Sequence, residues 1–289
     1  MSIAEDIKKK IKGMTLLSQS ASQLLEMIGD ADHTLVDVVR IVECDSELTA
    51  HVLRAVNSAS FGLIAPVSTV SRAVSYLGDK MVVSLAINIS APQMFSQPLH
   101  GYESERNALW EHSLQTALAA KDIAVYARRA VNPEEAFTAG LLHDIGKSVI
   151  SEYMAGSAGG IIGKMDADEA GDYMDGERLY CGIDHCEAGF DLAKHWSFPP
   201  ALAETIMYHH SPEEAGEDYI HMAYVTHLAD MITMMLGSGT GADCMRYGLN
   251  PDYTNYIDLG RNELETIILD VAAEFAKTST MLSGEETLS

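Results

Sequence analysis

Eight of the eleven histidines of this chain lie between residues 112 and 227, and two of these, His143 and His185, stand beside aspartates. Five histidines and two aspartates form the set of interest: His112, His143, Asp144, His185, His209, His210 and Asp230. Imidazole nitrogen binds zinc, iron, nickel and copper, and a carboxylate can bridge two ions. The set therefore predicts a site for two divalent transition-metal ions, and it leaves open whether they are iron, manganese, zinc or nickel.

The donors can be divided between the two ions by chemistry. We expect one ion to be held by His112, His143, Asp144 and Asp230, and the other by Asp144, His185, His209 and His210. Asp144 is shared because a carboxylate is the group able to bridge. The adjacent pair His209-His210 precedes a proline, in a last helical turn that favours cations, so both should reach the same ion.

Two residues are candidates for direct catalysis, Asp144 as the bridging ligand and Lys147 one helical turn after His143. Lys147 could hold a phosphate oxygen or a catalytic water, or it could be a surface lysine that extends its amine into solvent. Ordinary structural roles are also open for these residues. His143 could be a buried histidine bonded to its neighbour, and His209-His210 two polar residues at a helix end. Cys186 could be a soft ligand or a small buried residue, and His227 could orient a ligand.

The elements that must position these groups are helical. Apolar residues recur at helical spacing almost throughout, so we expect an all-α fold with two helical lobes. The first lobe is predicted at 1–100 and the second at 101–277, followed by a frayed tail at 278–289. In the second lobe we expect helices at 107–128, 133–153, 183–194, 200–209, 219–236 and 262–276, and an ambiguous segment at 155–182. Thr34 and Asp37 have the spacing of a capping box, and Asp45 can cap the next helix.

Composition excludes several functions. The formal net charge of −23 disfavours binding to nucleic acid or to an anionic membrane surface. The longest apolar stretch, at 81–89, is too short to span a bilayer, and the charged start does not resemble a signal peptide. The four cysteines show no Cys-x-x-Cys spacing and are typical of a cytoplasmic protein with reduced thiols.

The pattern His112…His143-Asp144…Asp230 resembles the signature of the HD superfamily of metal-dependent phosphohydrolases. The first lobe narrows the resemblance to the HDOD domain, which is similar over roughly residues 14–277. The blocks that carry it are Val52-Leu53-Arg54-x-Val56-Asn57-Ser58-Ala59-x-Phe61-Gly62, Ala73-Val74-x-Tyr76-Leu77-Gly78, Leu141-Leu142-His143-Asp144-Ile145-Gly146-Lys147 and Ile183-Asp184-His185-Cys186-Glu187. The chain departs from the family at 15–18, where a Leu-Pro-rich start is replaced by Thr-Leu-Leu-Ser. The resemblance implies an all-α fold and a bacterial signalling or regulatory role with a protein partner.

Two functions remain open at this point. One is a signalling module whose metals are structural and whose first lobe offers a surface to a partner. The other is a metal-dependent phosphohydrolase acting on a nucleotide or another phosphoester. Hydrolysis of cyclic di-GMP is disfavoured, because the Gly-Tyr-Pro block of the related HD-GYP enzymes is replaced by Ser-Pro-Glu-Glu-Ala-Gly at 211–216 and their upstream glutamate by Ala108.

Overall fold

A computed structural model describes residues 2–30, 32–58, 61, 63 and 66–283 of the chain. Over these residues the protein is helical, and its only β-type pairing is an isolated bridge between Ala127 and Ile257. The all-α fold predicted from the sequence is therefore confirmed. None of the described helices is long and apolar enough to cross a membrane.

The first half of the chain forms seven helices in the described residues. They are α1 (Ile3–Lys12), α2 (Gln19–Ile28), α3 (Leu35–Glu43), α4 (Ser46–Val56), α5 (Val70–Leu77), α6 (Asp79–Ser90) and α7 (Pro92–Ser96). Local chemistry fixes their ends. The Thr34–Asp37 capping box is present, and the Asp45 carboxylate accepts the backbone N–H of Leu48 at 3.0 Å. Gly78 has a φ of 76°, which lets the chain turn directly from α5 into α6. Residues 59–60 and 62 of the Asn-Ser-Ala block lie outside the described residues.

The second half forms nine helices in the described residues. They are α8 (Ala108–Ala124), α9 (Pro133–Leu142), α10 (Ile145–Ile150), α11 (Ala158–Asp166), α12 (Tyr173–Cys181), α13 (His185–His195), α14 (Pro200–Tyr208), α15 (Ile220–Met235) and α16 (Arg261–Ser283). Among them are the three longest described helices, α8, α15 and α16. The predicted tail at 278–289 thus begins inside α16, and its last residues, 284–289, are not among the described ones. The ambiguous segment at 155–182 contains α11 and α12.

The prediction of one continuous helix at 133–153 is wrong, because the structure forms two helices there, α9 and α10. The chain leaves helical geometry at Asp144, with φ −96° and ψ 9°, and restarts as α10. The reason is packing, because α10 must turn to lie against α13. At their crossing a Cβ on Gly146 would overlap the carbonyl oxygen of His185, so only glycine allows this approach.

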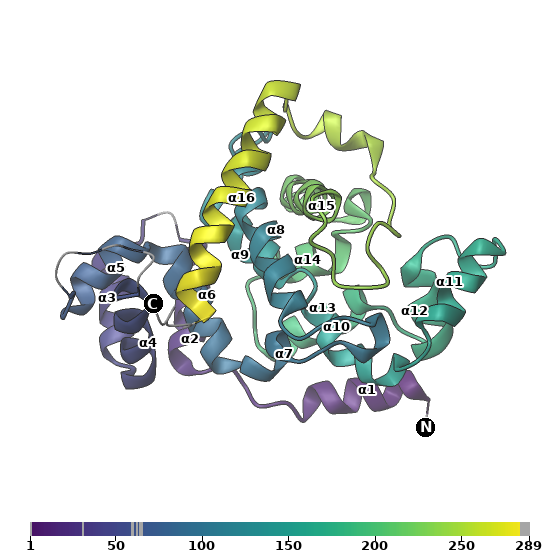
Figure 1. The fold of residues 1–289 in the computed structure, drawn as a ribbon, viewed down its shortest axis with the longest axis horizontal. Coiled ribbons are helices and arrows are strands. Elements are labelled where there is room, and N and C mark those ends of the chain that lie inside the picture. The colour runs from purple at the N-terminus through teal and green to yellow at the C-terminus, as the bar shows by residue number, and fades with distance from the viewer. Residues whose placement is uncertain (1, 31, 59–60, 62, 64–65, 284–289) are drawn as a thin grey trace, which may run out of the picture.

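Two groups of helices are visible in Figure 1, with α2 to α5 on one side and α8 to α15 on the other. Helix α1 packs against α13 and α10, so it lies against the second lobe although the sequence placed it with the first. The lobe boundaries at residues 100 and 277 stay a prediction. Helix α16 runs beside α8 and also touches α4, which links the two groups.

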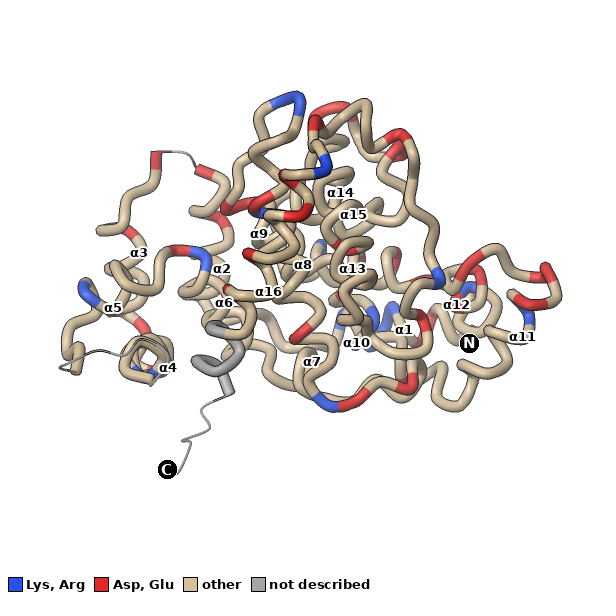
Figure 2. The backbone as a smooth tube through the Cα atoms, turned by 45° about the horizontal axis from the view of Figure 1, so that its top comes forward, with Lys and Arg blue, Asp and Glu red and all other residues tan. Residues whose placement is uncertain are grey.

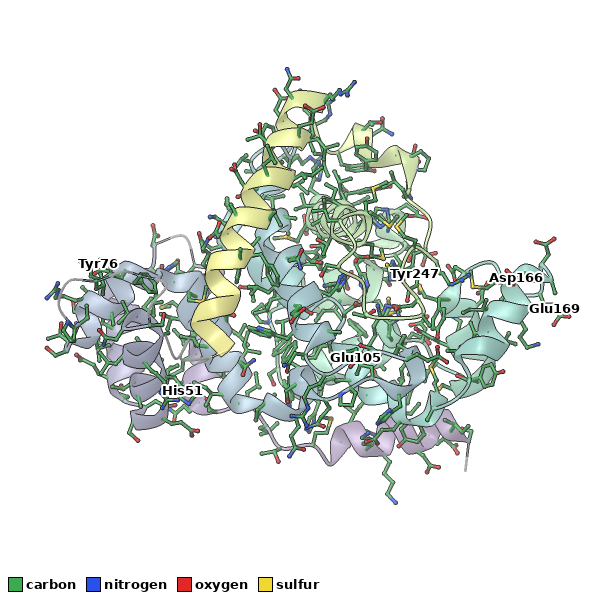
Figure 3. All side chains as sticks on the ribbon, in the orientation of Figure 1. His51, Tyr76, Glu105, Asp166, Glu169 and Tyr247 are labelled. Carbon is green, nitrogen blue, oxygen red and sulfur yellow. The ribbon has the colours of Figure 1, made fainter. Side chains whose placement is uncertain are left out.

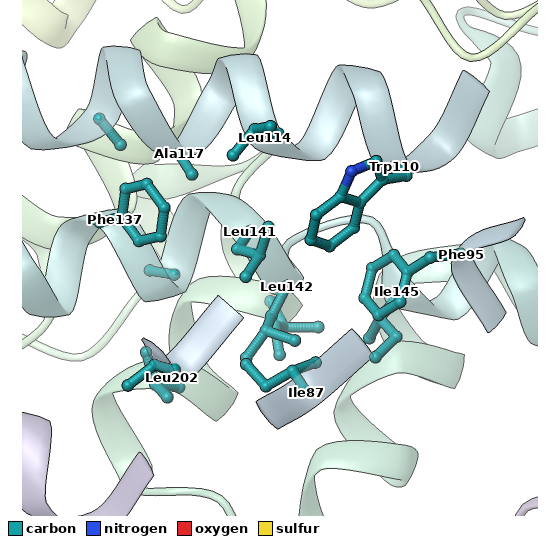
Figure 4. Close-up of a cluster of buried hydrophobic side chains, with 14 of the residues drawn as sticks. Ile87, Phe95, Trp110, Leu114, Ala117, Phe137, Leu141, Leu142, Ile145 and Leu202 are labelled. Carbon is teal, nitrogen blue, oxygen red and sulfur yellow. The ribbon is translucent and has the colours of Figure 1, made fainter. Parts of the chain in front are cut away.

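Apolar side chains from α6 to α10 form a core next to the polar centre described below. Ile87, Phe95, Trp110, Leu142 and Ile145 belong to it (Figure 4), and each is at most 9% exposed. The rings of Phe95 and Trp110 meet edge to face with centroids 5.5 Å apart. This cluster holds the end of α9 and the start of α10, where His143 and Asp144 lie.

Candidate metal centre

The structure brings all seven predicted donors together in one buried cluster. His112 comes from α8, His143 and Asp144 from the junction of α9 and α10, His185 from the first residue of α13, His209 and His210 from the end of α14, and Asp230 from α15. Six of them are at most 1% exposed, and the His210 side chain is 5% exposed. Two groups of donors lie close enough to share an ion: His112, His143 and Asp144, and Asp144, His185, His209 and His210.

The Asp144 carboxylate lies between the two groups. Its Oδ2 atom lies 3.5 Å from Nε2 of both His112 and His143. Its Oδ1 atom lies 3.4 Å from Nε2 of His185 and 3.6 Å from Nε2 of His209. Each oxygen therefore faces a different histidine pair, which is the arrangement of a bridging ligand.

Asp230 completes the first group. Its Oδ1 atom lies 3.0 Å from Nε2 of His112 and 3.6 Å from Nε2 of His143, and its Oδ2 atom lies 4.0 Å from Nδ1 of His210. Donors that share one ion through bonds of about 2.0–2.2 Å stand about 3–3.5 Å apart. The separations at Asp144 and Asp230 are therefore of the size that a shared ion requires.

Four of the histidines are oriented by their outer ring nitrogens. Nδ1 of His112, His143, His185 and His209 donates to Ser238 O at 2.6 Å, Gly140 O at 2.7 Å, the Glu177 carboxylate at 2.8 Å and Ile206 O at 3.0 Å, respectively. With Nδ1 as the donor, each Nε2 is an acceptor that faces the centre. The inner nitrogens of His112 and His143 are 3.3 Å apart, and those of His185 and His209 are 3.4 Å apart. Two facing acceptors cannot bond to each other, so each pair needs a positive charge between its members.

Several buried polar atoms of the cluster have no hydrogen-bond partner. They are both oxygens of Asp144, Oδ1 of Asp230 and both ring nitrogens of His210. Leaving such atoms buried without a partner costs free energy, and a folded protein rarely does so. The donor set therefore fits divalent metal ions.

The two aspartates are in the charge state that binds metal. Burial raises the pKa of Asp144, but the nearby charge of Lys147 outweighs it and holds that pKa well below its usual range. Burial acts on Asp230 in the same way, and the neighbouring imidazoles of His112 and His143 hold its pKa well below normal. Burial lowers the pKa of His210 well below normal, so its ring is neutral. Burial also lowers the pKa of His112, His185 and His209, but nearby acidic groups outweigh it and raise all three, so these rings would release protons on binding metal.

Lys147 is not the surface lysine that the sequence left as an alternative. It is 2% exposed because α10 lies inside the lobe. Its Nζ lies 2.6 Å from Asp243 Oδ2 and 3.0 Å from Thr240 Oγ1, and it forms an ion pair at 2.7 Å with Asp144 Oδ2 at angles unlike those of a hydrogen bond. Burial lowers its pKa, but the carboxylates of Asp144 and Asp243 raise it further, so the amine is charged.

Sequence reasoning missed the residues that close the centre. The segment between α15 and α16 supplies Ser238, Thr240, Asp243 and Tyr247, the last of which is labelled in Figure 3. The Tyr247 ring stacks on His210 with centroids 4.0 Å apart, and its hydroxyl donates to Asp243 at 3.0 Å. Nothing in the pattern of this segment marks these residues. Glu177 could have been found, because it lies on the face of α12 that buries Tyr173 and Cys181.

Two further residues support His209. Nδ1 of His227 donates to the His209 carbonyl oxygen at 2.8 Å, and its Nε2 accepts the backbone N–H of Asn250 at 2.9 Å. His227 thus holds the end of α14 in place, which is what a residue that orients the proposed ligand His209 would do. Cys186 Sγ lies 3.5 Å from His185 Nε2 and 3.7 Å from His209 Nδ1, so a soft-ligand role remains compatible with its position.

Comparison with known proteins gives a family match and a curated relative. The HDOD domain family matches residues 14–212, which is well over half of the chain. A curated relative, an uncharacterised protein of Treponema pallidum (strain Nichols), is 24% identical over 241 residues, which make up 82% of this chain and 45% of that protein. The chain thus spans less than half the length of that relative.

Solved structures share the fold. An HDOD domain protein of unknown function from Geobacter sulfurreducens matches with a TM-score of 0.65 and 24% identity, over 98% of this chain and 89% of that one. A protein from Marinobacter aquaeolei VT8, provisionally described as acting in signal transduction, matches with a TM-score of 0.76 and 19% identity, over 98% of this chain and 61% of that one. On the family match and this shared all-α architecture, the chain belongs to the HDOD domain family.

Proposed function

We propose that this chain is a regulatory protein of bacterial signal transduction that acts in the cytoplasm and whose second lobe is held by two divalent metal ions. His112, His143, Asp144 and Asp230 would hold one ion, and Asp144, His185, His209 and His210 the other. The observation that carries the proposal is the cluster of buried donor side chains, in which Asp144 belongs to two groups that are each close enough to share an ion. Metals in such a position would tie four helices, α8, α13, α14 and α15, to the junction of α9 and α10.

Enclosure favours a structural role for the ions over turnover. Catalytic metal sites keep a coordination position open to water and substrate, whereas structural sites are closed. Here every donor side chain is at most 5% exposed, and Lys147 Nζ already lies within 3.0 Å of oxygen atoms of Asp144, Thr240 and Asp243. A phosphoester could reach Lys147 only after the segment carrying Thr240 and Asp243 moved away.

A protein partner is the interaction that the surface supports best. Acidic positions are spread along most of the chain in Figure 2, whereas lysine and arginine are few, which argues against nucleic acid and anionic membranes. On the first lobe, Val36 of α3 and Tyr76 of α5 are 57% and 48% exposed. Exposed apolar side chains of this size are typical of protein interaction surfaces.

Metal analysis of protein purified without a histidine tag tests the proposal first, with two ions per chain expected. A pull-down from the source cells with the intact protein and with Asp144→Ala then asks whether the metal-bound fold recruits a partner. Asp270→Asn, an exposed change on α16, is the control for altered charge. Repeated failure to recover any partner, together with robust phosphoester turnover, would overturn the proposal.

A metal-dependent phosphohydrolase is the second candidate, favoured by the position of the charged Lys147 beside the bridging carboxylate. When bound, two ions could supply an activated water and stabilise charge on a phosphoryl group. Asp243→Asn weakens the hold on Lys147 and should raise activity if the segment acts as a cover. A panel of nucleotides and other phosphoesters that stays unhydrolysed by both proteins, each verified to carry two ions, would exclude this candidate.

A further inference from the structure

A cavity of about 250 Å³ lies beside the metal centre, between α12, the start of α13 and the end of α14. Of the seven donors, His210 is the one that lines it, and Cys186 lines it as well. The cavity thus reaches one proposed ligand from the surface of the second lobe.

The lining of this cavity is mostly acidic among its charged residues. Asp172, Asp184, Glu187 and Glu214 line it against a single cation, Arg178. That guanidinium is itself engaged, because it lies 2.6 Å from Asp184 Oδ2 and 3.2 Å from Asp175 Oδ1. The wall therefore keeps an excess of negative charge, which attracts cations and repels phosphate groups.

His210, the proposed metal ligand that lines the cavity, has no hydrogen-bond partner. The His210 side chain is 5% exposed, and neither of its ring nitrogens has a hydrogen-bond partner. An acidic approach that ends at an imidazole with unpaired ring nitrogens suits a metal cation.

We propose that this cavity is the entrance through which divalent cations reach the metal centre, with His210 as the first centre ligand that they meet. The inference rests on the proposed metal binding and adds its route. The acidic lining would also make the entrance selective for cations, because the carboxylates that attract a cation repel the negative charge of a phosphoester.

The charge on the wall can be tested through the rate of metal uptake. Glu187→Gln with Glu214→Gln removes two charges, and glutamine at 187 retains an oxygen for the helix cap. The probe is Co²⁺ added to metal-free protein, followed by its absorbance in a stopped-flow instrument. We expect uptake at least about threefold slower than wild type at about 10 mM salt, where charges act over roughly 30 Å. The difference should shrink at high salt, and the final Co²⁺ content should be unchanged.

Two further variants separate the route from net charge. Glu43→Gln with Asp270→Asn removes the same charge from exposed positions on α3 and α16, and uptake should match wild type. Ser211→Trp places a bulky ring in the cavity wall and should slow uptake at every salt concentration.

The outcomes distinguish this inference from the proposed function. If wild-type protein takes up no Co²⁺, the proposed metal centre fails, and the entrance with it. If it takes up two ions but both cavity variants load at the wild-type rate, only the entrance is refuted. A lower final content in the double Gln variant would also refute it, since those carboxylates would then be ligands rather than a passage.

Discussion

Replacement of Lys147 by methionine should destabilise the protein strongly when metal is withheld. The amine is 2% exposed and neutralises Asp144 and Asp243, which are each 1% exposed. Methionine fills similar space but leaves both carboxylates without their cation. Removal of one member of a buried ion pair costs about 3–5 kcal/mol. At about 2–4 °C per kcal/mol, Tm should fall by roughly 6 °C or more in EDTA.

Excess Mn²⁺ should reduce this loss, because a bound cation neutralises Asp144 in place of the lysine. The double variant Lys147→Met with Asp243→Asn should be more stable than Lys147→Met alone, since it removes one of the stranded charges. Lys164→Met is the matched control. Its partner Glu169 lies 3.0 Å away, but the pair is 38% and 62% exposed, and such pairs contribute at most about 1 kcal/mol.

Thermal and urea unfolding, each with EDTA and with Mn²⁺, measure these differences. If Lys147→Met stays within about 1 kcal/mol of wild type in EDTA, the buried charge network does not exist as described. If Mn²⁺ stabilises wild type and variant equally, Lys147 and the ions do not share Asp144.

Three other changes test separate parts of the structure. His209→Ala should lower metal content from two ions per chain to about one while the fold survives; loss of both ions, or of neither, would contradict the division of ligands. Gly146→Ala should lower the free energy of unfolding by about 1–3 kcal/mol and weaken metal binding, because the new Cβ pushes α13 and His185 away. Gly163→Ala in α11, where a Cβ meets nothing within 4 Å, is the control and should be neutral or stabilising in the same unfolding and metal assays. The Asp30 carbonyl and the Asp79 carboxylate raise the pKa of His33, so its charged form stabilises the fold below about pH 6.5 and this gain is lost as pH rises through the raised pKa. His33→Ala should therefore lose more stability at about pH 5.5 than at about pH 8.5, and an equal loss at both values would show that the charge of His33 is unimportant.

The seven residues of the buried cluster could be predicted because histidine and aspartate are recognisable as possible metal ligands from their residue types alone. His112 and Asp230 lie on long apolar helices, where a polar group signals a buried role, and His143-Asp144 falls at the end of an apolar run. Periodicity also located α8, α13 and α15 to within a few residues. The capping residues Thr34 and Asp45 could be read because a cap depends on neighbours only a few positions away.

Groups that act across long sequence distances could not be predicted. Asp243 pairs with Lys147 across 96 positions, and Ser238 binds His112 through a backbone carbonyl, which carries no sequence signal at all. The break before α10 was missed for a similar reason. Periodicity continues through residues 133–153, while the turn at Asp144 is imposed by α13 approaching Gly146 from elsewhere in the chain.

The docking of α1 on α13 means that the first group of helices is tethered at both ends. The chain leaves the second lobe after Lys12, passes through α2 to α6, and returns at α7 beside α8 and α10. Lys10 fastens the outgoing end to Glu152 at 2.8 Å, and His195 of α13 bonds the carbonyl oxygen of Met14 at 3.0 Å. A partner that pulled on the first group would therefore load α13 along its length, and the first residue of that helix is His185. Force applied to the first group of helices would then reach His185, a proposed metal ligand, through α13.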